Sequence, residues 1–135
     1  MKIKRVEHIA IAVHNMAESM AMLKNTLGLE LDYKETINST KLAMFPVGET
    51  SLELLEAGSP TSPVDDWIEE RGQSLFHPCF DVEDIDAALD ELRAKGVKLL
   101  DETPKAGHGG SRIAFLDPAS TGDILIELAE LPAGH

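Results

Sequence analysis

The sequence predicts an α+β fold built from two tandem βαβββ-type modules, and three observations support this class. First, residues 6–32 and 75–101 repeat each other, with His8 and His77 at equivalent positions 69 residues apart. Second, each copy runs from an alternating apolar strand into a helical apolar stripe and then into further strands. Third, the length of 135 residues suits a single domain. A repeat of this size indicates duplication of one structural unit.

The first copy opens with an alternating strand and continues as a helix. Asn15 is the predicted N-cap, and Gly28 supplies the left-handed residue that ends the helix. One strand face carries Ile9, Ile11 and Val13, the other carries His8, Ala10 and Ala12, and the helical stripe consists of Met16, Met20, Leu23 and Leu27. Strands at 41–48 and 50–57 complete this copy as a hairpin that turns at Gly48.

The second copy follows the same plan. Asp84 is the predicted N-cap of its helix, and Gly96 ends that helix. The apolar stripe consists of Ile85, Ala88, Leu89 and Leu92, and the closing strands are predicted at 111–118 and 123–130. The whole chain, 1–135, is thus one domain, with module 1 at about 1–58 and module 2 at about 74–131. A linker helix at about 62–72 lies between them, with Ser62 as N-cap, Pro63 at its first position and Gly72 at its end.

Composition limits the classes of partner. Twelve basic against twenty-four acidic side chains give a net charge of −12, which argues against nucleic acid and membrane surfaces and leaves small molecules. The chain has no apolar run of about 18 residues, and the short alternating start is typical of a strand rather than a signal peptide. Cys79 is the only cysteine, so an internal disulfide is excluded and a cytoplasmic location is expected.

Four polar residues occupy equivalent points on the apolar strands of the two copies. His8 and His77 lie on the first strands, and Glu53 and Glu127 lie on the last. A lone strand histidine is usually a core or rim residue, and a lone edge glutamate is usually solvated. The duplication of both favours a shared divalent cation, since a buried carboxylate without a partner is costly. Imidazole and carboxylate suit Zn, Co, Ni, Mn or Fe, and four protein ligands on a six-coordinate ion leave two positions for water or substrate.

Several segments carry a resemblance to a known family over nearly the whole chain. They read HIAIAV, LGLE, FPVGETSLELLE, SPVDDWIEERG, FDVEDIDAALDELRAKGVKLLDE, GGSRIAFLDP and STGDILIEL. The chain resembles the vicinal oxygen chelate superfamily, which includes glyoxalases and bleomycin-resistance proteins, and within it the methylmalonyl-CoA epimerases. The resemblance implies that the paired modules form a curved mixed sheet around a central metal, usually in a homodimer. It also implies that His8, Glu53, His77 and Glu127 bind that ion, with Co, Mn, Ni or Zn as candidates.

The activity implied by the resemblance is proton transfer at C2 of methylmalonyl-CoA or a related 2-substituted malonyl-CoA. The metal would stabilise the enolate that links the 2R and 2S forms, and Glu127 would be one of the two bases. The family often places the second base on the strand that reads TKLAMF here. Because that strand holds Lys41 and Leu42 and no carboxylate, Glu35 and Lys41 are the candidates for the second base.

Two other functions stay open at this point. A glyoxalase-I-like lyase uses the same ligand set on glutathione hemithioacetals, although basic residues for the glutathione carboxylates are not evident here. A ligand-binding protein without catalysis also fits, because the second carboxylate is missing from its usual strand.

Overall fold

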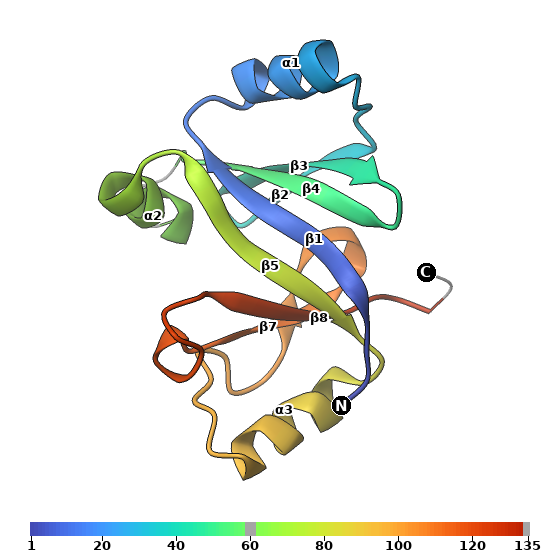
Figure 1. Ribbon diagram of the computed structural model, residues 1–135, viewed down its shortest axis with the longest axis vertical. Coiled ribbons are helices and arrows are strands. Elements are labelled where there is room, and N and C mark those ends of the chain that lie inside the picture. The colour runs from blue at the N-terminus through green and yellow to red at the C-terminus, as the bar shows by residue number, and fades with distance from the viewer. Residues whose placement is uncertain (59–61, 134–135) are drawn as a thin grey trace. The chain divides into compact units, whose positions relative to one another are not determined.

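A computed structural model describes residues 1–58 and 62–133 and confirms the α+β class with its two βαβββ-type units (Figure 1). The chain separates into two compact units. The first unit runs from His8 to Phe76, and the second takes in Met1–Glu7 together with the chain from His77 onward. In the described residues, no helix is both long and apolar enough to span a membrane.

The first unit is a mixed four-stranded arrangement with two helices. Its elements are β1 (Ile3–Val13), α1 (Met16–Leu27), β2 (Tyr33–Ile37), β3 (Thr40–Val47), β4 (Thr50–Glu56) and α2 (Pro63–Arg71). The strands lie in the order β2-β3-β4-β1. β1 runs parallel to β4, whereas β2, β3 and β4 form an antiparallel meander. The first five residues of β1, Ile3–Glu7, belong to the second unit.

The second unit repeats this plan with shorter strands. Its elements are β5 (Ser74–Val82), α3 (Ile85–Ala94), β6 (Lys105–Ala106), β7 (Arg112–Leu116) and β8 (Ile126–Glu130), with 3₁₀ turns at His108–Gly110 and Pro118–Ser120. The strands lie in the order β5-β8-β7-β6. β5 is parallel to β8, and β7 is antiparallel to β8 and β6, so the pairing pattern matches that of the first unit.

The helix caps that the sequence predicts are present. The side chain of Asn15 accepts a hydrogen bond from Glu18 N at 3.0 Å, and that of Asp84 accepts one from Ala87 N at 3.0 Å. Ser62 caps α2 by accepting from Val64 N at 3.2 Å. Gly28 ends α1 with φ 71°, a left-handed backbone that glycine adopts without strain. These contacts explain why the helices begin and end where the pattern places them.

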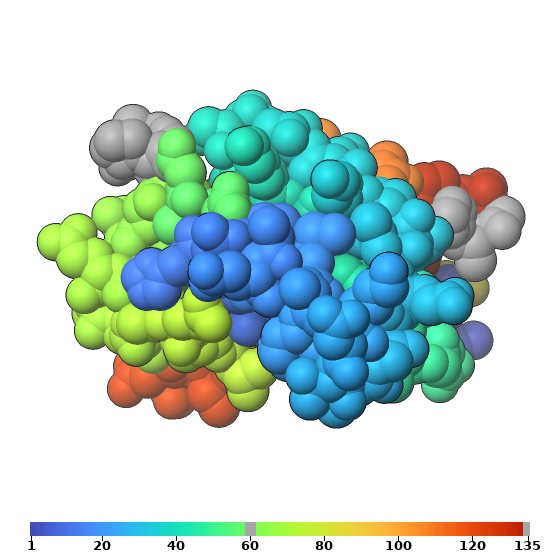
Figure 2. Space-filling model, turned by 90° about the horizontal axis from the view of Figure 1, so that it is seen from above, coloured from blue at the N-terminus to red at the C-terminus, as the bar shows by residue number. Residues whose placement is uncertain are grey.

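The two faces of the first sheet have different roles. One face packs on α1 through Val13, Leu23, Ala43, Phe45 and Leu54. The other packs on α2 through Ala10, Ala12, Leu42, Met44, Leu55, Val64 and Ile68. The predicted alternation of β1 and β4 is therefore confirmed. Only Ser19 and Leu23 of α1 are buried, and Figure 2 shows this helix (blue) on the surface.

The second sheet divides in the same way. One face packs on α3 through Val82, Ile85, Ala88, Leu89, Leu92, Ala114, Leu116 and Leu128. The opposite face holds a smaller cluster of Cys79, Ile113 and Ala129, with Phe115 against it. Each unit thus leaves one face of its sheet for groups other than its βαβ helix.

Two predicted strand boundaries are wrong, and one strand was not predicted. The predicted strand 123–130 begins only at Ile126, because Asp123 has a positive φ of 66° in the turn that precedes it. The predicted strand 111–118 ends at Leu116, before Pro118 starts a 3₁₀ turn. The segment around Glu35, for which the sequence pattern predicts no strand, is strand β2. Its polar residues pair with β3 at the edge of the sheet, where propensity is a weak guide.

Candidate metal centre

The first unit contributes a buried histidine–glutamate pair from β1 and β4. The parallel register aligns Ala10 with Glu53, and Ala10 shares the strand face of His8. His8 Nε2 lies 3.4 Å from Glu53 Oε1, and the two side chains are 1% and 6% exposed. Both point to the face opposite α1, because Leu52 and Leu54 on either side of Glu53 pack toward that helix.

The second unit contributes the equivalent pair from β5 and β8. His77 Nδ1 lies 3.9 Å from Glu127 Oε1, and the side chains are 2% and 5% exposed. The ring of Phe115 meets His77 edge-on, with centroids 4.9 Å apart. Cys79 lies in register with Glu127, is fully buried and packs with Ile113, as expected of a small filler.

Each pair has the chemistry of half a metal site. Both separations exceed the length of a good hydrogen bond, so the two side chains of each pair lie near one another without forming a strong hydrogen bond between them. Two N and O ligands held at about 2.1 Å from one six-coordinate ion lie about 3.0 Å apart at adjacent positions, so each pair lies within about 1 Å of the ligating separation. The donor set therefore fits a borderline divalent cation, and all four predicted ligands are among the described side chains able to help hold an ion.

A third buried His–carboxylate contact was not predicted. His108 Nε2 lies 2.6 Å from Glu7 Oε1, and each side chain is 7% exposed. Both residues belong to the second unit, with His108 in the glycine-rich segment 106–110 and Glu7 on β1. A signal for Glu7 existed in the sequence. The alternation of β1 puts it on the apolar face of Ile9, where a carboxylate needs a buried partner.

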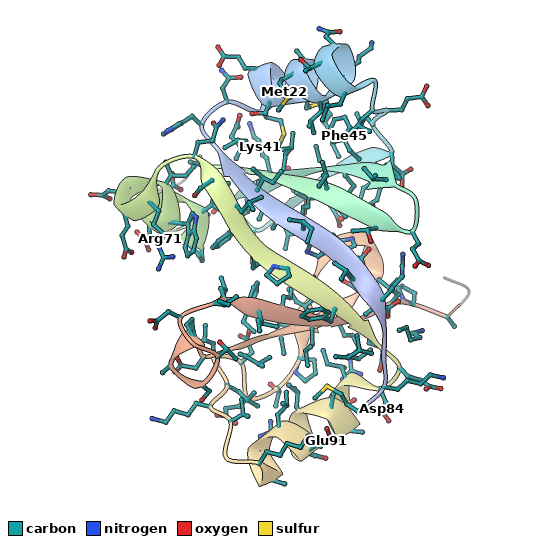
Figure 3. All side chains as sticks on the ribbon, viewed as in Figure 1. Met22, Lys41, Phe45, Arg71, Asp84 and Glu91 are labelled. Atoms are coloured by element: carbon teal, nitrogen blue, oxygen red, sulfur yellow. The ribbon has the colours of Figure 1, made fainter. Side chains whose placement is uncertain are left out.

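The structure separates the two candidates for the second base. Glu35 lies opposite Leu42, which lies opposite Leu55, so all three share the face that carries Glu53. Lys41 lies opposite Glu56 on the other face. Figure 3 shows Lys41 and Phe45 on the side of the sheet that carries α1. The sheet therefore places Glu35, and not Lys41, on the face of the metal-ligand candidates in this unit.

Comparison with known proteins identifies the class to which this fold and these pairs belong. The sequence profile of the Glyoxalase/Bleomycin resistance protein/Dioxygenase superfamily matches residues 7–115. The chain belongs to this superfamily, which confirms the family resemblance read from its sequence.

Within this superfamily, the chain is similar in sequence to several individual proteins. The chain is 36% identical over 128 residues to an uncharacterised Bacillus subtilis protein, YqjC, covering 93% of this chain and 91% of the relative. It is 34% identical over 133 residues to the mitochondrial methylmalonyl-CoA epimerase of Dictyostelium discoideum, covering 95% of this chain and 79% of that enzyme.

The solved structures that resemble this chain also include methylmalonyl-CoA epimerases. A structure of a Streptomyces coelicolor methylmalonyl-CoA epimerase variant in complex with 2-nitronate-propionyl-CoA has a TM-score of 0.94 and 31% identity, covering 98% of this chain and 97% of that one. Epimerisation is an isomerase activity, so the enzyme class expected from the sequence is confirmed at the level of these relatives.

Proposed function

We propose that this protein is a metal-dependent epimerase of methylmalonyl-CoA or a related 2-substituted malonyl-CoA. The proposal rests mainly on one observation: each of the two duplicated units contains a buried His–Glu pair. Relatives that carry a named activity are methylmalonyl-CoA epimerases, and one structural neighbour holds an acyl-CoA analogue. The acidic chain leaves small molecules as its partners, and an acyl-CoA fits that class.

In this proposal, His8 and Glu53 from the first unit and His77 and Glu127 from the second hold one divalent ion. Cobalt, manganese, nickel and zinc all suit two imidazoles with two carboxylates. The bound ion supplies Lewis-acid stabilisation for negative charge that develops on the substrate when C2 loses its proton. The neighbouring Phe115 and the apolar sheet faces limit water around these ligands, which strengthens their electrostatic effect.

The proton transfer requires a base on each face of C2. We assign one role to the Glu127 carboxylate, which takes the C2 proton while the C–H electron pair enters the enolate. We assign the second to Glu35, whose carboxyl returns a proton to the opposite face. Glu35 is half-buried and lies directly across β2–β3 from Leu42. In this proposal the second carboxylate therefore comes from β2 and not from β3, the strand on which the family resemblance would place it. Lys41 is the weaker candidate because it lies on the other face of β3.

We also place the protein in the cytoplasm as a homodimer. The location follows from the single buried thiol Cys79, which favours a reducing compartment. The dimer follows from the family resemblance.

Solvent exchange tests the function directly. Purified protein loaded with cobalt is incubated with methylmalonyl-CoA in D₂O, and deuterium at C2 is measured by mass spectrometry. The proposal predicts rapid exchange that EDTA stops. Glu35→Gln should suppress exchange about 10²–10⁴-fold, the usual contribution of an acid or base. The matched change Lys41→Gln, one strand away and on the other face, should leave exchange nearly unchanged.

Other outcomes would select another function. An absence of exchange with cobalt, manganese, nickel and zinc would contradict the epimerase. Turnover of a glutathione hemithioacetal by the same loaded protein would then identify a glyoxalase-I-like lyase. Metal and ligand binding without turnover of either substrate would identify a non-catalytic binding protein.

A further inference from the structure

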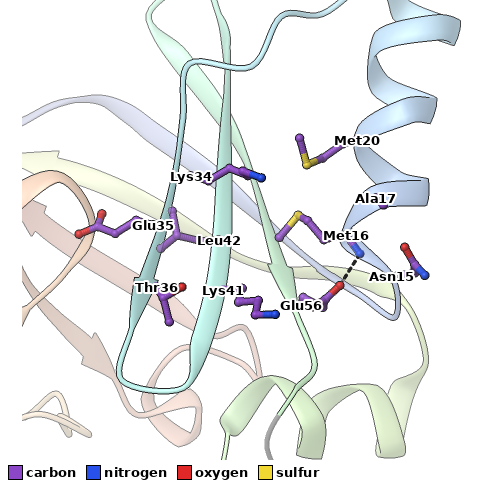
Figure 4. A pocket seen from close by; sticks show the side chains of 10 residues that line it. All are labelled: Asn15, Met16, Ala17, Met20, Lys34, Glu35, Thr36, Lys41, Leu42 and Glu56. Atoms are coloured by element: carbon purple, nitrogen blue, oxygen red, sulfur yellow. Dashed lines mark hydrogen bonds between the residues drawn. The ribbon is translucent and has the colours of Figure 1, made fainter.

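A second candidate site lies in the first unit, on the α1 side of the sheet. A cavity of about 540 Å³ lies beside the N-terminal half of α1, against β2 and β3 (Figure 4). Its lining consists of Asn15, Met16, Ala17, Met20, Lys34, Glu35, Thr36, Lys41, Leu42 and Glu56. This volume lies within the range of about 300–1,000 Å³ that is usual for small-molecule sites.

The charged side chains of this cavity differ in whether they form a hydrogen bond or ion pair within the chain. The Glu56 carboxylate is engaged, since its Oε2 accepts a hydrogen bond from Met16 N at 2.6 Å. Lys34 and Lys41 form no ion pair with any residue among 1–58 and 62–133. Figure 4 shows both lysines on the α1 side of the strands, with the Glu35 carboxylate directed away from Lys41 and Glu56. The cavity therefore holds two available cations beside one engaged anion, Glu56, while the second acidic lining residue, Glu35, directs its carboxylate away from them.

The equivalent position of the second unit shows what such a cation binds. Glu130 Oε1 accepts a hydrogen bond from Ile85 N at 3.1 Å, as Glu56 does from Met16 N. Arg112 lies in register with Glu130, as Lys41 does with Glu56. The guanidinium of Arg112 then donates two hydrogen bonds to the Asp86 carboxylate, at 2.9 and 3.1 Å. In the second unit, the Asp86 carboxylate on α3 thus balances the positive charge of Arg112.

The first unit lacks this carboxylate. Asp86 is the second residue of α3, and the second residue of α1 is Ala17. Ala17 lines the cavity, so the missing side chain coincides with open space beside Lys41. The first unit therefore keeps the cation, Lys41, and the helix-bound glutamate, Glu56. Among the described residues, no side chain takes the place beside Lys41 that Asp86 takes beside Arg112.

We propose that this cavity binds a small aliphatic carboxylic acid, whose carboxylate pairs with Lys41 in the place that Asp86 takes in the second unit. Lys34 adds a second positive charge, and the N-terminal end of α1 favours an anion nearby. Met16 and Met20 offer an apolar, adaptable surface for the alkyl chain. The metal-ligand candidates do not line this cavity, although the proposed second base Glu35 does. The binding proposal does not depend on the epimerase activity, because hexanoate binding is measured without metal or thioester substrate.

Calorimetric titration with hexanoate tests the proposal. The full chain is kept in EDTA, so that no metal ion can bind the carboxylate. Saturable binding of one hexanoate per chain is expected. Hexanol, which has the same alkyl chain without charge, should bind at least about ten-fold more weakly, because a charge-assisted hydrogen bond is lost.

Variants locate the site. Ala17→Asp supplies the missing carboxylate from the chain and should weaken hexanoate binding about ten-fold or more, as should Lys41→Met. Lys24→Met is the matched control, because Lys24 lies on the same helix outside this cavity and should leave the affinity unchanged.

Three results would overturn the proposal. They are no saturable binding of hexanoate, equal binding of hexanol, or undiminished hexanoate affinity in both Ala17→Asp and Lys41→Met. Displacement of hexanoate by an equal concentration of inorganic phosphate would overturn the carboxylate class. None of these results bears on proton exchange, so the epimerase proposal stands or falls separately.

Discussion

The two units keep the same contacts along their parallel strand pairs, β1–β4 and β5–β8, and differ at the strands farthest from those pairs, β2 and β6. In each unit, the last residue of the closing strand, Glu56 or Glu130, accepts a hydrogen bond from the first N–H of the helix. Each also carries a buried His–Glu pair on its two parallel strands. Duplication has thus preserved the contact that joins strand to helix and the candidate metal ligands of each unit.

The sheet edges show the divergence. The edge strand β2 of the first unit has five residues, including Glu35, whereas its counterpart β6 has two. The second unit instead continues into a glycine-rich segment whose His108 is held by Glu7 at 2.6 Å. The two units are therefore alike in their candidate metal ligands and unlike in the side chains around them.

The sharpest way to test this similarity is to change the two equivalent glutamates. Glu127→Gln should lower the rate of C2 proton exchange about 10²–10⁴-fold with little change in KM, because an acid–base group is lost. Glu53→Gln should mainly weaken metal binding, and saturating cobalt should restore much of the exchange. Steady-state kinetics of deuterium incorporation, measured across a cobalt titration, separate the two effects. Equal rates for Glu127→Gln and the wild type would remove Glu127 from catalysis.

Truncation of a buried leucine should lower the free energy of unfolding by a similar amount in either unit. Leu54 in the first unit and Leu89 in the second are each 1% exposed, and truncation to alanine should cost about 2–5 kcal/mol of unfolding free energy in either unit. Leu27→Ala is the control, since Leu27 is 61% exposed and should change stability by no more than about 0.5 kcal/mol. Urea unfolding followed by circular dichroism measures all three. A loss for only one of the two buried leucines would show that the units do not share equivalent cores.

Removal of a helix N-cap should reduce stability by a smaller amount. Asn15→Ala and Asp84→Ala each remove a 3.0 Å hydrogen bond to a helix N–H and should each destabilise the fold by about 1 kcal/mol. Thermal unfolding of the two variants measures the losses. Exposed Asn38, which lies outside the helices, provides a neutral comparison as Asn38→Gly, because its φ of 55° suits glycine. No destabilisation in either cap variant would contradict the assigned caps.

The smallest effect concerns the ion pair present in the second unit only. The hydrogen bond from Arg112 holds the pKa of the Asp86 carboxyl below its usual value. The stabilisation from Asp86 is therefore present above its unfolded-state pKa and is lost as pH falls through the lowered folded-state pKa. Arg112→Ala should raise the pKa of Asp86 toward normal in a carbon-detected NMR titration. An unchanged pKa would remove Arg112 as the cause.

Much of the fold follows from the sequence because local rules decide it. The caps Asn15, Asp84 and Ser62 and the alternation of β1 and β4 need only neighbouring residues to be recognised. The pairing of His8 with Glu53 could also be predicted, because both residues recur in the second copy.

The remaining features depend on long-range pairing. The strand around Glu35 has a polar sequence and is fixed by its register with β3, which a local pattern does not reveal. That register also decides that Glu35 and Lys41 lie on opposite faces. The Glu7–His108 contact joins residues about a hundred positions apart, so only the folded chain brings them together.

The central claim is that the two His–Glu pairs hold one ion between them, and cobalt stoichiometry tests it most directly. Elemental analysis after dialysis should find one cobalt per wild-type chain. His77→Ala and His8→Ala should each lose tight binding by more than about 100-fold, because loss of a ligand should exceed the 10–100-fold cost of losing its outer-shell partner. The exposed His14→Ala should keep full stoichiometry. Two cobalt ions per chain, or full stoichiometry in His77→Ala, would contradict the account.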